Sequence, residues 1–145
     1  MSILVSGGAG YIGSHTCVEL GQAGYDIVVA DNLVNSSSES LRRVEQIVGK
    51  PIPFVKAELC NPDEVEAIFA QYPDIDAVIH FAGLKAVGES VAKPLEYYTN
   101  NLVNTLMLLN AMRKHGVKNF VFSSSATVYG DPASVPIRED FPTGA

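Results

Sequence analysis

The chain has 145 residues, of which 47% are hydrophobic, and carries a formal net charge of −6. A chain of this size is typical of one globular domain that buries about 68 to 70% of its unfolded surface. Its lysines and arginines are scattered, which argues against nucleic acid or a membrane surface as a partner. No export signal or long apolar run is evident. Cys17 and Cys60 have neither disulfide nor zinc spacing, so we expect reduced thiols in a cytoplasmic protein.

The first predicted elements are a strand at residues 3–5, a glycine-rich turn and a helix at residues 11–23. Gly8, Gly10 and Gly13 form a G-x-G-x-x-G pattern in the turn. In a dinucleotide-binding unit such glycines allow a tight turn, let backbone N–H groups approach a pyrophosphate, and bring the helix against its strand. The helix N-terminus adds positive potential at the phosphates. The sequence therefore predicts a dinucleotide site at this turn.

The second predicted strand, residues 27–30, ends at an acid. Asp31 follows Gly13 by eighteen residues, the position from which a carboxylate accepts hydrogen bonds from the adenosine ribose. A 2′-phosphate about 4 Å away would meet roughly 4 kcal/mol of repulsion at an effective dielectric constant near 20. The acid therefore favours NAD over NADP.

The remaining apolar runs predict three more strands, at residues 53–57, 77–81 and 119–123. Helical spacing separates the strands, and the later helices are expected to begin near Ser38, Pro62 and Pro94. The polar residues 35–38 form a loop that can cap the next helix. Five strands alternating with four crossovers predict an α/β, doubly wound parallel sheet with order 3-2-1-4-5, which is the Rossmann NAD-binding fold.

The last predicted helix has a wider apolar surface than packing on one sheet requires. Its apolar residues are Leu102, Val103, Leu106, Met107, Leu108, Leu109, Ala111 and Met112. Such a helix is buried on a second side. A later part of the same chain and a second subunit are equally good candidates for the cover.

Polar residues that follow the strands are candidates for the site, because ligands of open α/β sheets bind beyond the carboxyl ends of the strands. Glu58 can meet the adenine, although an exposed surface acid is as good a reading. Lys85 can reach ribose or phosphate, although a solvated loop lysine is commoner. Alternation along the fifth strand would place Ser123 and Ser125 on one face, where a serine could hydrogen-bond a substrate hydroxyl.

No nucleophilic triad or metal site is indicated. The chain contains no G-x-S-x-G elbow. His15, His80 and His115 lie on different elements and have no spacing suited to a metal or a triad, so we interpret all three as structural.

Longer motifs extend the glycine pattern: GGAGYIGSH at residues 7–15, DNL at 31–33, HFAGLKAVGES at 80–90, PLEYY at 94–98 and SSSATVYG at 123–130. With Gly7, Gly10 and Gly13 in the G-x-x-G-x-x-G form, the chain resembles the extended short-chain dehydrogenase/reductases that act on nucleotide sugars, and among them the carbon-4 epimerases. The resemblance covers nearly the whole chain. It implies NAD-dependent epimerisation of UDP-glucose and UDP-galactose through a 4-keto intermediate, in a homodimer.

The resemblance also implies roles for particular residues. Ser125 matches the catalytic serine or threonine. The residues implied to bind the cofactor are Gly7, Gly10, Tyr11, Ile12 and Gly13 at the turn, Asp31, Asn32, Leu33, Asn35 and Ser36 at the adenosine ribose, Glu58 and Leu59 at the adenine, and Phe81, Ala82, Gly83, Lys85, Asn100 and Ser123 along the rest of the dinucleotide. In place of the Gly-Asp usual in the family, this chain has Ala57 and Glu58, which moves the charge at the adenine.

The chain departs from the family where the base should lie, because none of its tyrosines has a lysine four residues later. The family places this Tyr-x-x-x-Lys pair shortly after Ala145. We therefore expect these residues to be the front portion of a longer enzyme, with a substrate domain to follow and negligible epimerase activity in this piece alone. A catalytically inactive NAD-binding module is the alternative, and a Tyr-x-x-x-Lys beyond Ala145 would decide against it. A nucleotide-sugar 4,6-dehydratase is disfavoured, because Ala126 and Thr127 replace the acids that protonate its leaving hydroxyl.

Overall fold

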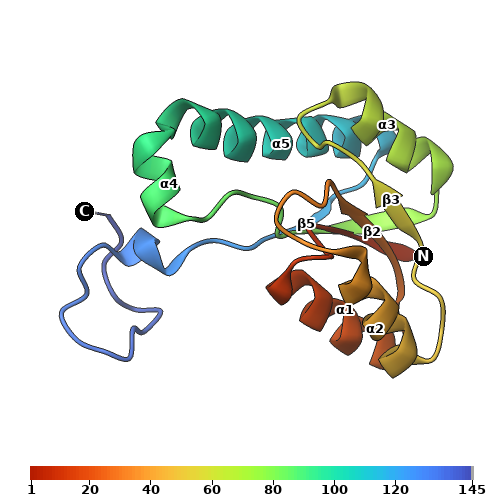
Figure 1. The fold of residues 1–145 in the computed structure, drawn as a ribbon, viewed down its shortest axis with the longest axis horizontal. Coiled ribbons are helices and arrows are strands. Elements are labelled where there is room, and N and C mark those ends of the chain that lie inside the picture. The colour runs from red at the N-terminus through yellow and green to blue at the C-terminus, as the bar shows by residue number, and fades with distance from the viewer. Residues whose placement is uncertain (145) are drawn as a thin grey trace.

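The computed structural model describes residues 1–144 and consists of one parallel sheet between two layers of helices (Figure 1). The sheet contains β1 (Ser2–Ser6), β2 (Asp26–Asp31), β3 (Phe54–Lys56), β4 (Ile75–His80) and β5 (Asn119–Phe122). Its order is β3-β2-β1-β4-β5, and every neighbouring pair is parallel. The predicted fold class and strand order are confirmed.

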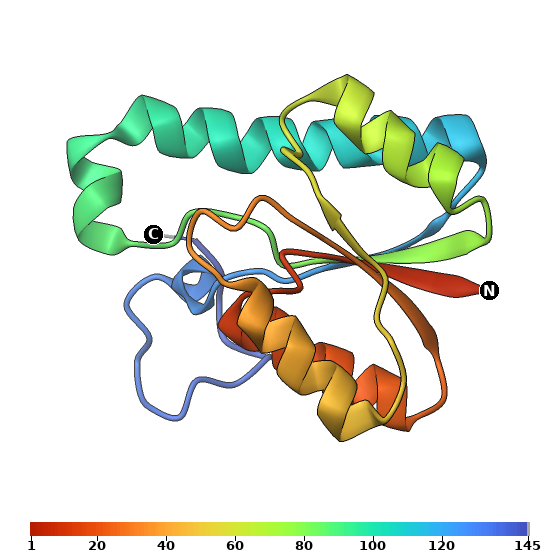
Figure 2. The same cartoon turned by 45° about the vertical axis from the view of Figure 1, so that its right-hand side comes forward.

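The helices are α1 (Tyr11–Gln22), α2 (Ser38–Val48), α3 (Pro62–Gln71), α4 (Val87–Ala92) and α5 (Pro94–His115), and a 3₁₀ helix, η1, spans Ala126–Tyr129. Helices α1 and α2 cover one face of the sheet, and α3 and α5 cover the other, as the two views in Figures 1 and 2 show. Because all strands run the same way, their carboxyl ends meet at one edge, and the loops that follow them converge there.

Alternation along β1 divides the core into two clusters. Leu4 packs with the residues beneath α3 and α5, whereas its neighbour Val5 packs with those beneath α1 and α2. Both side chains are fully buried. Strands covered on both faces need apolar residues at consecutive positions, which is why the strands could be recognised as continuous apolar runs.

Local sequence signals set where two of the helices begin. Ser37 caps α2 by accepting a hydrogen bond from the backbone N–H of Glu39, and Asn61 caps α3 by accepting one from Asp63. Pro62 and Pro94 occupy the first turns of α3 and α5, where a proline loses no helical hydrogen bond. The predicted helix starts are confirmed.

The structure corrects several predicted bounds. The third strand is only Phe54–Lys56, the fourth begins two residues earlier than predicted and ends at His80, and the fifth ends at Phe122. The fourth crossover contains α4 as well as α5. A six-residue helix is too short to display a readable apolar periodicity, so α4 was not predicted.

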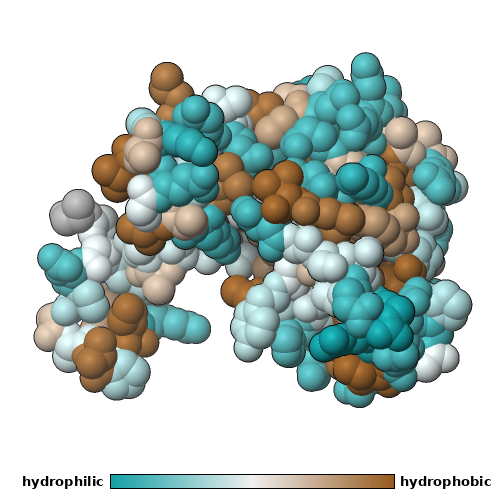
Figure 3. All heavy atoms as spheres, in the orientation of Figure 1, coloured by the Kyte–Doolittle hydropathy of each residue, from teal (hydrophilic) through white to brown (hydrophobic). Residues whose placement is uncertain are grey.

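Helix α5 has an exposed apolar stripe. Leu108, Ala111 and Met112 are buried against the sheet, whereas Leu102 and Leu106 are 58% and 55% exposed. The stripe continues through Leu95, Tyr98 and Leu109. In Figure 3 single hydrophobic side chains are exposed among hydrophilic ones around α4 and the start of α5, and the segment after β5 stands clear of the body. None of the helices within residues 1–144 combines the length and the hydrophobicity that a bilayer span requires.

Candidate functional site

A pocket lies at the carboxyl edge of the sheet, where ligands of open α/β sheets bind. Loops after β1, β2, β3 and β4 and one face of α5 form its walls. The predicted site residues that line it are Gly7, Gly10, Asp31, Asn32, Asn35, Ser36, Glu58, Leu59, Phe81, Ala82, Gly83 and Asn100. Residues that the sequence prediction placed at separate strand ends thus share one pocket.

The glycine turn brings two loops into backbone contact. Gly7 has a φ of +72°, and a Cβ there would lie 2.6 Å from the backbone nitrogen of Ala82. Only glycine combines this left-handed conformation with so close an approach. Gly7, from the loop after β1, and Ala82, from the loop after β4, both line the pocket.

Helix α1 begins at this turn without a side-chain cap. Its N-cap is Gly10, which has no side chain to accept a hydrogen bond. Helices α2 and α3, by contrast, are capped by the side chains of Ser37 and Asn61. The leading N–H groups of a helix need acceptors, and a phosphate oxygen supplies them. The turn and the uncapped helix therefore fit the pyrophosphate of a dinucleotide.

Asp31 fixes the loop that follows β2. Its Oδ1 accepts hydrogen bonds from Leu33 N and Ser36 Oγ, both at 2.8 Å, and its Oδ2 accepts one from Ala9 N at 3.1 Å. Leu33 has a φ of +63°, a conformation that a non-glycine residue holds only when its surroundings enforce it. The bond from Ala9 ties this loop to the glycine turn.

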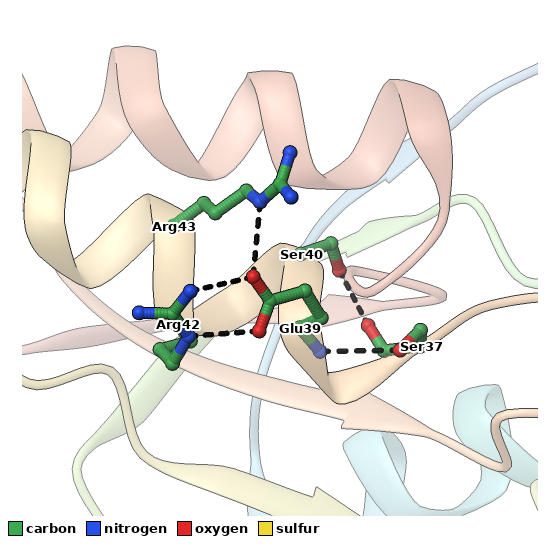
Figure 4. Close-up of polar contacts among 5 residues, drawn as sticks. All are labelled: Ser37, Glu39, Ser40, Arg42 and Arg43. Carbon is green, nitrogen blue, oxygen red and sulfur yellow. Dashed lines mark hydrogen bonds and ion pairs between the residues drawn. The ribbon is translucent and has the colours of Figure 1, made fainter.

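The start of α2 anchors the far end of the same loop. Ser40 Oγ lies 2.7 Å from both Ser37 O and Ala9 O. Figure 4 shows Glu39 between Arg42 and Arg43, which both hydrogen-bond to its carboxylate. These ion pairs are largely exposed and contribute little stability. The bond from Ser40 to Ala9 is the one that couples α2 to the glycine turn.

Glu58 joins the loops after β2 and β3. Its Oε2 accepts a hydrogen bond from Asn32 Nδ2 at 2.9 Å, and its Oε1 accepts one from Cys60 N at 3.1 Å. Partial burial acts to raise the pKa of Glu58, but these hydrogen bonds outweigh it and hold the pKa below its ordinary value. The residue is therefore a charged member of the pocket wall, with an internal partner for each oxygen.

A chain of polar side chains connects β1, β4 and α5. Ser6 Oγ is 2.5 Å from His80 Nδ1, and His80 Nε2 is 3.0 Å from Thr105 Oγ1. Burial lowers the pKa of His80 to about 4, so its imidazole is neutral near pH 7. His80 joins β1, β4 and α5, which is the structural role expected of it. No cluster able to hold a metal ion occurs within residues 1–144.

Some predicted site residues lie outside the pocket: Tyr11, Ile12, Gly13, Leu33, Lys85, Ser123 and Ser125. The side chains of Tyr11 and Ile12 line a separate groove between α1 and α2. The predicted fifth strand was too long, because β5 ends at Phe122 and both serines lie beyond it; strand alternation therefore does not place their side chains. Ser125 instead caps η1, accepting a hydrogen bond from Thr127 N.

Two lining residues, Ala57 and Asn104, were not assigned to the cofactor by the sequence analysis. Asn104 follows Asn100 by one helical turn and is 2% exposed. Residues four apart share a helix face, so this spacing was the signal that could have identified Asn104.

Comparison with known proteins gives a uniform result. Residues 3–145 match the family model described as NAD dependent epimerase/dehydratase family. The chain is 64% identical over 145 residues to UDP-glucose 4-epimerase of Bacillus subtilis and 60% identical over 144 residues to that of Haemophilus influenzae. It covers 42% of the length of each. The chain thus spans about two-fifths of these relatives.

Solved structures that are similar to this chain carry the same name as these relatives. UDP-glucose 4-epimerase from Bifidobacterium longum in complex with NAD⁺ and UDP superposes with a TM-score of 0.94 at 56% identity, over 99% of this chain and 43% of that one. The enzyme from Stenotrophomonas maltophila, with bound NAD and formylated UDP-arabinopyranose, superposes at 0.92 with 46% identity, over 100% of this chain and 43% of that one.

Proposed function

The chain belongs to the NAD dependent epimerase/dehydratase family, and from this premise we propose that it is the NAD-binding part of an enzyme that interconverts UDP-glucose and UDP-galactose. The observation that carries the proposal is the single pocket shared by the glycine turn, Asp31 and Glu58. Similarity to proteins named UDP-glucose 4-epimerase supports the substrate. Residues 1–145 are assigned to a cofactor domain, and a substrate domain follows them in the complete protein.

NAD is assigned to the pocket and to the start of α1, whose N-cap Gly10 is part of the pocket wall. Backbone N–H groups at Tyr11 and Ile12, at the uncapped start of α1, bind the pyrophosphate. Asp31 accepts hydrogen bonds from the adenosine ribose, since its Oδ2 has only one internal donor. Glu58 and Leu59 border the adenine, and the loop at residues 81–85 borders the rest of the dinucleotide.

The chemistry that bound nicotinamide supplies is reversible hydride transfer at carbon 4 of the sugar. The part of this chain in the reaction is assigned to Ser125. Thr127 Oγ1 lies 2.9 Å from Ser125 Oγ and donates to it, which leaves the serine's own hydrogen for a substrate oxygen. Ser125 thereby orients the sugar hydroxyl whose proton is removed, and a Tyr-x-x-x-Lys pair beyond Ala145 supplies the base.

The complete protein is proposed to be a cytoplasmic homodimer that pairs through α5. The apolar stripe at Leu102, Leu106 and Leu109 is exposed in this chain, and self-complementary helix faces suit a two-fold interface. Cys17 and Cys60 are free thiols, as is usual in a reducing compartment.

The decisive experiment is to incubate the complete gene product with UDP-glucose and separate the products. We expect UDP-galactose to form until both sugars reach equilibrium. A 4-keto-6-deoxy sugar would instead identify a dehydratase, and tight NAD binding without any conversion would identify an inactive module. Either outcome would refute the proposal. The 145-residue chain assayed alone should give negligible conversion.

A further inference from the structure

Asn101 ties the loop between β4 and α4 to helix α5. Its Oδ1 accepts a hydrogen bond from Leu84 N at 2.8 Å, and its Nδ2 donates one to Leu84 O at 2.9 Å. One side-chain amide thus satisfies both backbone groups of one loop residue, as a neighbouring strand would do. Asn101 does not itself line the pocket.

The residues that Asn101 touches do line the pocket. Leu84 and Gly83 form part of the wall, and a Cβ on Gly83 would lie 3.3 Å from Asn101 Oδ1. Asn100, also in the wall, donates from its Nδ2 to the same Oδ1 at 2.9 Å. Asn101 therefore contacts two parts of the wall, one in the loop and one on the helix.

The backbone of Asn101 is in turn fixed to the sheet. Its carbonyl oxygen accepts a hydrogen bond from Thr105 Oγ1 at 2.9 Å, and Thr105 Oγ1 lies 3.0 Å from His80 Nε2. His80 is the last residue of β4. The loop that leaves β4 is therefore connected back to the end of that strand through α5.

We propose that Asn101 is a positioning residue for the bound dinucleotide, acting on the part beyond the adenosine by fixing the loop at residues 81–84 and the amide of Asn100. This inference rests on the proposed function. The adenosine end has its own supports, because Asp31 and Glu58 are held by bonds to Ala9, Leu33, Ser36, Asn32 and Cys60. Loss of the Asn101 amide should thus affect one end of the ligand and spare the other.

The test is to compare the binding of NAD and of ADP to the complete protein by calorimetry. Asn101→Leu removes both bonds to Leu84 and should weaken NAD binding by about tenfold or more, while ADP affinity changes by less than about twofold. Asn101→Asp retains an acceptor for Leu84 N but sets a carboxylate oxygen against Leu84 O, so it should weaken NAD binding at least as much as Asn101→Leu. Asn110→Leu, an identical change at an exposed position of α5, should alter neither affinity.

The outcomes separate this inference from the function on which it rests. If the unaltered protein binds no NAD, the proposed function itself fails. If it binds NAD but Asn101→Leu weakens NAD and ADP equally, or weakens neither, the positioning role is overturned. Should Asn101→Leu not fold, Asn101→Asp is measured in the same way, and failure of both variants to fold would make Asn101 a residue of the fold rather than of the site.

Discussion

Replacing Gly7 by alanine disturbs both properties that the glycine turn requires, namely a left-handed backbone and room for a close approach. Comparison with the same change at a second left-handed glycine separates the two contributions. At a φ of +72°, an alanine loses about 1–2 kcal/mol relative to glycine. The new Cβ would also lie 2.6 Å from Ala82 N, 2.8 Å from Ala82 Cα and 2.9 Å from Phe81 C. These are backbone atoms that cannot rotate away, so the two loops must separate, which adds about 1–3 kcal/mol.

Gly116 provides the matched control. It ends α5 with a φ of +73°, and a Cβ there would meet no atom within 4 Å. Gly116→Ala therefore carries only the backbone part of the penalty, about 1–2 kcal/mol. Gly7→Ala should destabilise the protein by about 2–5 kcal/mol, which is the sum of the backbone and contact contributions.

The assay is urea-induced unfolding of both variants without ligand, followed by NAD titration. Gly7, Phe81 and Ala82 all line the pocket, so Gly7→Ala should also weaken NAD binding by about tenfold or more, since about 1.4 kcal/mol of lost binding free energy suffices. Gly116→Ala should leave NAD affinity unchanged. Equal losses of stability in the two variants, together with equal NAD affinities, would refute the reasoning.

Two further predictions concern His80 and α5. Burial holds the pKa of His80 at about 4 rather than 6.5, so the unfolded chain takes up this proton first as the pH falls. The free energy of unfolding should therefore decrease by about 3 kcal/mol between pH 6.5 and pH 4. Urea unfolding at pH 7 and at pH 4.5 should show that the free energy of unfolding decreases less in His80→Gln than in the unaltered protein. Equal decreases in the two proteins would contradict the role of burial. For the proposed dimer, Leu106→Glu in the complete protein should shift sedimentation toward monomers, whereas Ile47→Glu, equally exposed on α2, should not; unchanged sedimentation of both variants would exclude the α5 interface.

Local signals were sufficient for much of the fold. The apolar runs, the glycine turn and the prolines at Pro62 and Pro94 each act within a few residues of the chain. Strand order followed from a general rule for alternating strands and helices. Strand ends were less predictable, because they depend on pairing with a neighbour: β3 pairs with β2 over only three residues, although its apolar run is longer.

The site residues also fall into two groups: those that a local pattern identifies and those that depend on contacts between distant segments. Asp31 could be identified as a candidate from its place after a strand, whereas the partners of Glu58 could not, since Asn32 lies 26 residues away in the sequence. Asn101 gave no signal, because its function depends on Leu84, seventeen residues earlier. The serines at the end of β5 were placed by an alternation that stops when the strand stops.

By itself the sequence determined which segments form the strands and the longer helices, where α2, α3 and α5 begin, and which backbone turn must be glycine, because each of these is governed by short-range sterics and hydrogen bonding. Only the tertiary structure decided how the carboxylate of Glu58 is satisfied, which residue fixes the loop after β4, and which face of α5 stays exposed. Those features depend on contacts between elements that the chain brings together only after the sheet has formed, so no spacing within one segment encodes them.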